Sequence, residues 1–542
     1  MKLNLLLFIG LCLSLSCFCQ DQDAWVYFTD KQTNVYSVTN PTTFLSQKAI
    51  DRKIAHGVSV DESDIPVNET YISQLKTETG ITVLAKSKWF NAVHVRGTET
   101  NINSLSVLSF VSSIEFADKS LNTLKTQQTK RSSKFQETFT TYNYGSAANQ
   151  IQMFKGDQLH LAGYTGTGMT VAVLDAGFPN VNTMSSFQHL RVTGQILGNY
   201  DFVNRNEDVY TNTTSNHGTL VLSTMAGYVE NQYVGTAPDA SYYLFITEDT
   251  RLTGGIENEN PLEESLWVEA AERADSLGVD VINTSLGYKD FNNTNYSYSN
   301  SDLDGYTAYI TKGANIAFQK GMLLVNSAGN EGNNGVNAPA DSPNVFSIGA
   351  VASNGDYAYF SSIGSVYQPT QKPDVVAQGL ASAVINQFDT IGTSDGTSFS
   401  SPIMAGGLVC LWQALPNKTN AEIMQLVRES ASQYTNPDYK LGYGIPDLQL
   451  ALNKALSTDT FQVDNLDLKI YPNPARSMIY FDLPSTETEL TIQLYTILGN
   501  HVNDFSVNHT NKGIDISHLS TGMYIAKFQS KGVSKSFKII KT

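Results

Sequence analysis

The sequence predicts an α/β protein whose largest domain is built on a doubly wound, mainly parallel sheet. Three observations lead to this prediction. Between residues 143 and 456, continuous apolar runs alternate with helical patterns, as in strands buried on both faces of a parallel sheet. Before this region the chain alternates short strands and helices, and after residue 465 its hydrophobic periodicity changes to two. We therefore expect a small α/β domain before the main sheet and a β-sandwich after it.

The N-terminal region, residues 20–118, has the pattern of a small α/β domain. Strands are expected at 25–30, 81–87, 91–97 and 111–118, and helices at 44–57, 68–79 and 101–110. This order is typical of a split βαβ arrangement. The next segment, 119–142, is polar and basic without apolar periodicity, so we expect it to be an exposed linker in which proteolytic processing occurs.

The main and C-terminal regions are separated by a second expected linker, 457–465. In the main region, buried strands are predicted at 169–176, 241–247, 279–287, 321–329 and 344–351. In residues 466–542, strand candidates lie at 477–483, 490–496, 501–507, 513–517, 523–529 and 533–539. Turn residues separate these short candidates, which is the pattern of a small β-sandwich.

Composition and charge limit the class of protein. The 542 residues are 41% hydrophobic and 16% charged, which is an ordinary globular composition. A net charge of −16 argues against nucleic acid as a partner, because phosphate binding needs clustered Lys and Arg. Residues 1–19 contain one early lysine and an apolar run that is too short to span a bilayer comfortably. We expect a cleaved export signal there, with acylation of Cys17 as the alternative.

Three short motifs carry the predicted chemistry. VAVLDAG at 171–177, SNHGTLV at 215–221 and DGTSFSSP at 395–402 contain Asp175, His217 and Ser398. A serine hydroxyl is a poor nucleophile until a base takes its proton, and the base needs a carboxylate to hold its tautomer. The order acid, base, nucleophile distinguishes this chain from two other groups of enzymes that use the same trio. The motifs therefore predict an acyl-transfer site.

Each motif also has a simpler interpretation. Asp175 ends a buried strand and would serve there as a cap, and a lone histidine such as His217 is more often structural. Ser398 opens a buried helix, where serine is an ordinary N-cap. We expect Gly396 to permit the tight turn before this helix and Pro402 to lie in its first turn. Together, the three motifs are far more specific than any one alone.

Residues 144–447 resemble the subtilisin-like (subtilase) peptidase family over nearly their whole length. Besides the three motifs, the resemblance rests on blocks in the family order: VGTAPDA, DVINTSLG, VNSAGNEG, APADSPNVFSIGAV and KPDVVAQG. It implies that Asp175 orients the imidazole, His217 is the general base and acid, and Ser398 is the nucleophile. It also implies that Asn330 stabilises the oxyanion together with the backbone N–H of Ser398.

The same resemblance suggests where a peptide substrate binds. The segments that would flank the substrate backbone and form the primary side-chain pocket consist of Ser285, Leu286, Gly287, Ser327, Ala328 and Gly329. Glu331 would lie at the mouth of that pocket, where a carboxylate favours basic or polar side chains. An exposed loop charge explains Glu331 equally well. The acidic segment 248–267 is expected to rim the cleft.

The chain departs from the family pattern at two places. Ala176 follows the catalytic aspartate where many relatives have Ser or Thr, so one hydrogen bond near the carboxylate is expected to be missing. The loop 227–235 is shorter than in relatives that bind calcium there, and it lacks a clear set of ligands. We expect no cofactor in the chemistry and assign no metal ligands. Structural calcium is an unsupported alternative, with Asp302 and Asp304 as candidate ligands.

The flanking regions acquire roles from the same resemblance. Residues 20–118 resemble the propeptides of these enzymes, which assist folding and inhibit the cleft until they are cleaved. Residues 466–542 contain YPNPARSMIYFDL and LSTGMYIAKF, and resemble the sorting domain that directs Bacteroidetes proteins through the type IX secretion system. We therefore expect a secreted or outer-surface monomer. Its expected partners are protein or peptide substrates, its own propeptide and the type IX machinery.

The sequence thus predicts a secreted serine endopeptidase that hydrolyses peptide bonds of proteins. A different class of function stays open, in which a catalytically silent relative serves as a surface binding or structural protein. The intact triad and Asn330 argue against that alternative. In a third interpretation the C-terminal β-domain carries the main role by binding polysaccharide or protein. Labelling of Ser398 and deletion of the C-terminal domain would distinguish the three.

Overall fold

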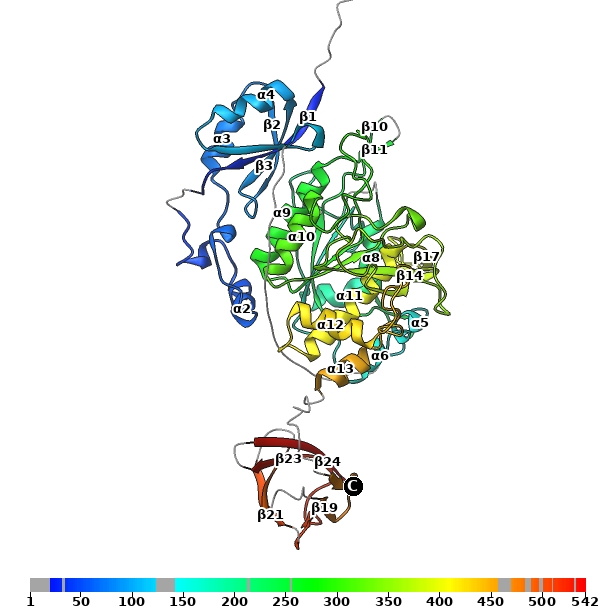
Figure 1. Cartoon of the computed structure of the whole chain (residues 1–542). Helices are drawn as coiled ribbons and strands as arrows, with labels where there is room; N and C mark the ends of the chain where they lie inside the picture. Colours follow the sequence, from blue (N-terminus) through cyan, green and yellow to red (C-terminus); the bar gives the residue numbers. More distant parts are fainter. Residues whose placement is uncertain are drawn as a thin grey trace, which may run out of the picture. The chain divides into compact units, whose positions relative to one another are not determined.

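The computed structural model of the chain describes residues 20–31, 35–122, 142–211, 215–253, 256–456, 469–482, 489–496, 501–508, 510–530 and 533–542. The predicted leader (1–19), the predicted linker 457–465 and most of the predicted processing region 119–142 lie outside these residues. The chain forms two compact units, Met1–Lys454 and Ala455–Thr542 (Figure 1). The first unit contains both the N-terminal module and the main sheet.

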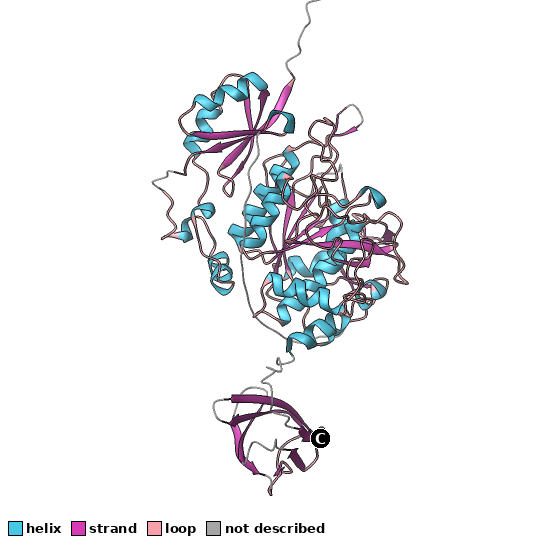
Figure 2. Ribbon diagram, in the orientation of Figure 1, coloured by secondary structure: helices cyan, strands magenta, loops and turns pink. Residues whose placement is uncertain are grey.

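A seven-stranded parallel sheet forms the centre of the first unit (Figure 2). Its strand order is β15-β14-β13-β12-β5-β9-β6, and every neighbouring pair is parallel. The strands are β5 (Thr170–Asp175), β6 (Ile196–Asp201), β9 (Ser241–Ile246), β12 (Val281–Thr284), β13 (Leu323–Ser327), β14 (Val345–Val351) and β15 (Val375–Gln378). The predicted doubly wound parallel sheet is therefore confirmed.

The five predicted runs form the interior of this sheet. They correspond to β5, β9, β12, β13 and β14, which are buried over most or all of their length. The strands that the apolar runs did not predict, β6 and β15, lie at its two edges. Most residues of β6 are partly exposed, so its sequence carries no continuous apolar run.

Helices cover both faces of the sheet (Figure 1). Helices α8 (His217–Ala226) and α11 (Thr397–Ala414) pack together on one face, and α9 (Leu262–Leu277) and α10 (Tyr309–Gln319) pack together on the other. The remaining helices of this domain are α5 (Ala148–Gln152), α6 (Gly156–Leu161), α7 (Gln188–Val192), α12 (Asn420–Ser430) and α13 (Leu448–Leu456). Helix α12 begins with a capping box, in which Thr419 accepts from the backbone of Glu422 and the Glu422 side chain accepts in return.

The main region also contains short two-stranded hairpins outside the central sheet. They are formed by β7 (Tyr228–Val229) with β8 (Tyr233–Val234), β10 (Leu252–Thr253) with β11 (Ile256–Glu257), and β16 (Ser382–Ile385) with β17 (Ile391–Ser394). In the described part of the chain, no helix combines the length and the apolar content that crossing a bilayer requires.

The N-terminal module has the predicted split βαβ order. Its antiparallel sheet has the order β2-β3-β1-β4, and a separate apolar cluster fills the space between this sheet and its helices. The elements are β1 (Asp21–Phe28), α2 (Gln47–Ala55), α3 (Glu69–Leu75), β2 (Ile81–Ser87), β3 (Ala92–Thr98), α4 (Glu99–Ser104) and β4 (Val111–Phe116). Helix α2 lies in a long excursion between β1 and α3, and Ser46 caps it by accepting from the N–H of Ala49.

The second unit contains two antiparallel sheets. One has the order β18-β19-β22 and the other β21-β20-β23-β24, and a single apolar cluster contains residues of both. The strands are β18 (Lys469–Tyr471), β19 (Met478–Asp482), β20 (Glu489–Thr496), β21 (His501–Asn508), β22 (Gly513–Asp515), β23 (Gly522–Ser530) and β24 (Val533–Lys541). This strand-rich unit agrees with the predicted β-sandwich.

Candidate active site

The carboxylate of Asp175 and the imidazole of His217 form a close pair. Asp175 is the last residue of β5 and His217 is the first of α8, so a helix start lies against the carboxyl edge of the sheet. His217 Nδ1 donates to Asp175 Oδ1 at 2.7 Å, and the backbone N–H of Ala176 donates to the same oxygen at 2.7 Å. The carboxylate is fully buried, whereas the imidazole is partly exposed. Nε2 is thus the nitrogen left for proton exchange with a substrate.

Gly218 permits this close approach of helix and strand. A Cβ at this position would lie 2.5 Å from the carbonyl oxygen of Gly177 and 3.1 Å from the Cβ of Asp175. Real side chains do not tolerate the first of these distances, and the packed interior has little room to yield. Any larger residue would therefore push the start of α8, and with it the imidazole, away from the carboxylate.

The electrostatic surroundings favour a charged imidazole. Burial alone would lower the pKa of His217, but the charge of Asp175 and its hydrogen bond outweigh burial, so the pKa lies above its usual value. Asp175 Oδ2, in contrast, is buried and has no hydrogen-bond partner among the described residues. The methyl side chain of Ala176 offers it no hydroxyl. The missing hydrogen bond expected at Ala176 thus corresponds to an unpaired oxygen on the acid.

Ser398 lies at the start of α11. It is the one residue of this helix that is not buried. Gly396 caps the helix with φ of +142°, a conformation that residues with a Cβ rarely adopt. The ring of the next residue, Phe399, lies 6.0 Å from the ring of His217, measured between centroids. The partly exposed Ser398 thus precedes a residue whose ring lies near the imidazole of His217.

Ser398 also exchanges two hydrogen bonds with Ser285. The Ser398 hydroxyl donates to the carbonyl of Ser285 at 3.2 Å, and the Ser285 hydroxyl donates to the carbonyl of Ser398 at 2.9 Å. The prediction that Pro402 lies in the first turn is wrong, because α11 begins at Thr397 and Pro402 is its sixth residue. Proline has no N–H for the carbonyl four residues earlier, which is that of Ser398. The hydroxyl of Ser285 supplies this missing donor.

Asn330 holds its side-chain amide in one orientation. Its Oδ1 accepts from the backbone N–H of Thr397 at 2.9 Å and from the hydroxyl of the same residue at 3.0 Å. Nδ2 is therefore the end of the amide that remains as a donor. A Cβ built on Gly396 would lie 3.6 Å from Asn330 Nδ2 and 3.6 Å from the backbone N of Ser398. Two donors thus flank one point beside Gly396, the arrangement that an oxyanion requires.

The two predicted substrate segments follow neighbouring parallel strands. One comes directly after β12, and the other begins at the last residue of β13, so they lie side by side at the carboxyl edge. Asn326 Nδ2 links them by donating to the carbonyls of Leu286 at 3.1 Å and Ser327 at 2.8 Å. The buried members are Ser285, Ser327 and Ala328, the partly exposed ones Leu286 and Gly329, and the exposed one Gly287.

The remaining predicted positions have individual surroundings. Glu331 is exposed, and its backbone N–H donates to the hydroxyl of Ser362 at 3.0 Å. Asp302 forms an ion pair with Lys119 at 2.9 Å. Asp304 accepts from the backbone N–H groups that follow it in its own turn. Among the described residues, neither aspartate belongs to a group of three or more acidic, histidine or cysteine side chains close enough to hold one metal ion.

Three carboxylates that the motifs did not mark form a cluster just beyond β9. Glu248, Glu259 and Glu263 have carboxylate oxygens within 4.8 Å of one another. Burial and the charge of Glu259 raise the pKa of Glu248 to about 8. Protons or a hard cation such as Ca²⁺ can neutralise such a group. The signal in the sequence was the acidic segment 248–267, which pointed to the region without identifying these residues.

Glu248 also lines a pocket of about 570 Å³ at the carboxyl ends of β6 and β9. Its charged lining residues are Asp201, Glu207, Asp208, Glu248, Asp249 and Arg251. Arg251 Nε is paired with Asp249 Oδ1 at 2.6 Å. Because β9 is the neighbour of β5 in the sheet, this acidic pocket lies on the same edge as Asp175. The position agrees with the expectation that the acidic segment rims the cleft.

Comparisons with known proteins match all three regions. The Bacteroidota Peptidase S8 propeptide domain matches residues 23–134, the subtilase family matches 166–444, and a secretion system C-terminal sorting domain matches 469–542. The resemblances expected from the sequence are thereby confirmed.

Individual relatives are subtilisins and related proteases. Subtilisin NAT of Bacillus subtilis subsp. natto is 32% identical over 306 residues, which cover 56% of this chain and 70% of that protein. Subtilisin E of Bacillus subtilis has the same identity and coverage. A thermostable alkaline protease of Halalkalibacterium halodurans is 28% identical over 288 residues, which cover 53% of this chain and 68% of that protein.

Proposed function

Because this chain belongs to the subtilase family of serine endopeptidases, we propose that Asp175, His217 and Ser398 are the residues with which it hydrolyses peptide bonds of proteins. The observation that carries the proposal is the 2.7 Å contact between His217 Nδ1 and the buried carboxylate of Asp175, with the partly exposed Ser398 next to Phe399, whose ring lies near the imidazole. A buried acid, a partly exposed imidazole and an accessible hydroxyl are the three parts that acyl transfer requires.

In the proposed mechanism, Ser398 Oγ attacks the carbonyl carbon of the scissile bond while His217 Nε2 takes the hydroxyl proton. The imidazolium then gives this proton to the leaving amine, and an acyl-enzyme remains on Ser398. Water, activated by the same nitrogen, hydrolyses the ester and restores the serine. Throughout, Asp175 accepts the hydrogen bond from Nδ1 and stabilises the positive ring, as the raised pKa of His217 indicates.

The negative oxygen of each tetrahedral intermediate would be stabilised by two donors. They are Asn330 Nδ2 and the backbone N–H of Ser398, which lie at equal distances from one point beside Gly396. Thr397 holds the Asn330 amide before substrate arrives, so no reorganisation is needed as charge develops. We assign no cofactor or metal to this chemistry.

One observation favours the silent alternative. The Ser398 hydroxyl donates to the carbonyl of Ser285 rather than to the imidazole. Attack therefore requires rotation of the serine side chain about its Cα–Cβ bond. Catalytic hydrogen bonds are often loose before substrate binds and tighten in the complex, so this orientation is compatible with catalysis.

Covalent labelling tests the proposal. A fluorophosphonate should label the processed protein at Ser398, and Ser398→Ala should abolish both labelling and peptide hydrolysis. Ser400→Ala is the matched control, since Ser400 is a buried serine of the same helix whose hydroxyl donates within that helix to the carbonyl of Thr397. Absence of labelling in a folded, processed chain would favour the silent binding or structural protein.

We further propose that the chain is made with a leader over residues 1–19 and is cut between about residues 119 and 143. The match to a propeptide domain supports an inhibitory role for the N-terminal module, and the sorting domain points to a secreted or outer-surface protein. N-terminal sequencing of the active, secreted form should find a start in the interval 119–143. An active enzyme that starts at Gln20 would contradict the processing. Deletion of residues 466–542 should abolish export and leave peptidase chemistry intact.

A further inference from the structure

Two parts of the N-terminal module make extensive contacts with the catalytic domain (residues 143–456), and the side chain of Lys88 links them through Asp275. The first is the face of its sheet. The ring of Trp25 stacks on Tyr309 of α10 with centroids 4.2 Å apart, and its Nε1 donates to the hydroxyl of Ser265 of α9 at 2.8 Å. Glu272 of α9 accepts from the backbone N–H of Lys88 at 2.8 Å. This contact uses the long sides of α9 and α10.

The second contact is made by the excursion between β1 and α3, which we call the α2 arm (residues 45–65). Gly278 caps the carboxyl end of α9 with φ of +82°. A Cβ at this position would lie 2.7 Å from the backbone N of Ala49. Gly321, with φ of +93°, follows α10, and a Cβ there would lie 3.1 Å from His56 Nδ1. The α2 arm therefore packs against the carboxyl ends of both helices, at positions where glycine leaves it room.

Cations of the α2 arm lie at these helix ends. Arg52 donates to the carbonyls of Val279 and Lys320, just beyond α9 and α10, and it pairs with Asp275 in the last turn of α9. The carbonyls at a helix carboxyl end have no partner within the helix and carry partial negative charge, so a guanidinium is stabilised there.

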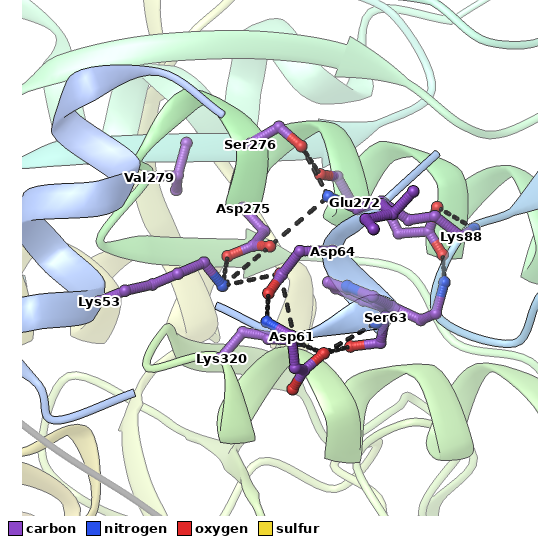
Figure 3. A network of polar contacts seen from close by, with 12 residues as sticks. Lys53, Asp61, Ser63, Asp64, Lys88, Glu272, Asp275, Ser276, Val279 and Lys320 are labelled. Atoms are coloured by element: carbon purple, nitrogen blue, oxygen red, sulfur yellow. Dashed lines mark hydrogen bonds and ion pairs between the residues drawn. The ribbon is translucent and has the colours of Figure 1, made fainter. Parts of the chain in front are cut away.

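A buried network of charges joins the α2 arm to the catalytic domain (Figure 3). Lys53 Nζ lies 3.0 Å from Asp275 Oδ1 and 3.0 Å from Asp64 Oδ1, and Lys320 Nζ lies 3.2 Å from Asp64 Oδ1. Lys53 and Asp64 belong to the α2 arm, whereas Asp275 and Lys320 belong to the catalytic domain. Their side chains are almost completely buried. Each charge has its full set of partners only while the two parts are together.

This network lies at the edge of the sheet opposite to the candidate active site. Lys48 Nζ lies 3.1 Å from Asp280 Oδ2, immediately before β12, and also donates to the hydroxyl of Thr170. Thr170 begins β5 and Asp175 ends it. At about 3.3 Å per residue, the two ends of this strand are roughly 17 Å apart. The α2 arm thus binds without contacting the triad.

We propose that the α2 arm is a second anchor, which adds to the sheet-face contact and keeps the N-terminal domain on the catalytic domain after the chain between them is cut. The inference rests on the proposed processing of the chain. Two anchors on one fragment make rebinding of either one intramolecular while the other holds, so dissociation is slow without any contact at the active site. The arm thereby lengthens the time for which the cut enzyme keeps its N-terminal domain.

The test uses an inactive full-length chain, so binding is measured apart from catalysis. Ser398→Ala prevents self-cleavage, and a recognition sequence for an unrelated, site-specific protease is placed between residues 123 and 141. After cutting, the catalytic part is immobilised and release of the N-terminal fragment is timed. Lys53→Met and Asp275→Asn should each accelerate release on the order of 100-fold, as expected for breaking a buried charge pair. The double variant should accelerate release by less than the product of the two single effects, because both substitutions remove the pair of Lys53 with Asp275.

Two further variants keep the test decisive. Lys48→Ala removes a half-exposed cation and is expected to fold in any case; it should accelerate release about two- to five-fold. Lys86→Met is the matched control, since Lys86 belongs to an exposed pair with Glu69 inside the N-terminal module and should change nothing. Release of Asp275→Asn at the rate of Lys86→Met would overturn the proposal. Failure of Ser398 labelling would contradict the proposed peptidase activity but would not change the result expected in this release assay.

Discussion

Polar side chains have different surroundings at the two edges of the central sheet. At the amino edge, Arg52, Lys53 and Asp275 are buried in ion pairs with one another, and Arg52 also donates to helix-end carbonyls; among the described residues its Nε alone has no partner. At the carboxyl edge, Asp175 Oδ2 has no hydrogen-bond partner among the described residues, while His217 and Ser398 are partly exposed at the starts of their helices. The first arrangement stabilises a contact, and the second leaves groups available for chemistry. The difference shows that burial in ion pairs, and not the number of polar groups, separates an anchor from an active site.

The largest effect is expected from His217→Ala at the carboxyl edge. Without the base, the serine hydroxyl cannot lose its proton, and kcat should fall by about 10⁶-fold, the magnitude known for the corresponding change in subtilisin. Steady-state hydrolysis of a peptide substrate measures the loss, with Ser400→Ala as the control that should retain activity. A His217→Ala enzyme within 100-fold of the parent would contradict the assigned role.

At the amino edge, Asp275→Asn should affect stability and spare chemistry. Burial alone would raise the pKa of Asp275, but Lys53, Lys88 and Arg52 lower it below its usual value. The stabilisation is therefore present above the unfolded pKa of about 3.9 and is lost as pH falls through the lower folded value. Removing the charge at neutral pH should reduce the free energy of unfolding of the uncut Ser398→Ala chain by about 3–5 kcal/mol.

Denaturant titration measures this loss. Glu69→Gln, at an exposed ion pair of the N-terminal module, is the matched control and should cost at most about 1 kcal/mol. In the active chain, mature Asp275→Asn enzyme should keep the kcat of the parent, because the residue lies at the other edge of the sheet. Equal stability of Asp275→Asn and Glu69→Gln would remove the contrast between a buried network and a surface pair.

Asn330→Ala is expected to have a smaller effect on rate than loss of the base. Removal of one oxyanion donor costs about 10²–10³ in kcat, a value established for the subtilisin asparagine. KM should change little, because this hydrogen bond strengthens only as the carbonyl oxygen becomes negative. Asn333→Ala, at an exposed residue of the adjacent short turn Gly332–Asn334, is the control. A rise in KM with unchanged kcat would instead assign Asn330 to ground-state binding.

The smallest effect concerns pH. Because Asp175 raises the pKa of His217, the neutral base is lost as pH falls through a value above 6.5, and the acid limb of kcat/KM should lie there. Glu248 adds to this rise only while it is ionised, and burial and the charge of Glu259 raise its own pKa to about 8, so Glu248→Gln should leave this limb almost in place. A clear shift of the limb to lower pH in Glu248→Gln would show that Glu248 is ionised beside the imidazole.

Much of the fold follows from local patterns. The strands of the sheet interior are buried on both faces, so their apolar runs are readable one at a time. Edge strand β6 is partly exposed and short of apolar residues, and for that reason it gave no such signal. The position of Pro402 within α11 was predicted wrongly. The first residue of this helix depends on Gly396 and on the hydroxyl donor of Ser285, which lies far from it in the sequence.

The candidate site was likewise predicted only in part from local patterns. The motifs identified Asp175, His217 and Ser398, and glycine or another small residue beside each of them marked a close approach. They did not reveal the cluster of Glu248, Glu259 and Glu263, because those residues become neighbours only when the acidic segment folds back on itself. The α2 arm was predicted as a helix, but nothing in its residues indicated what it would contact.

By itself, the sequence determined the fold class, the three-part organisation and the candidates for the triad, since hydrophobic period and short motifs are local properties of the chain. Only the tertiary structure decided which polar groups are paired. A hydrogen bond or an ion pair joins residues that lie up to hundreds of positions apart, such as Lys53 and Asp275. Whether such a group anchors a domain or remains free to react depends on the neighbours that folding brings to it.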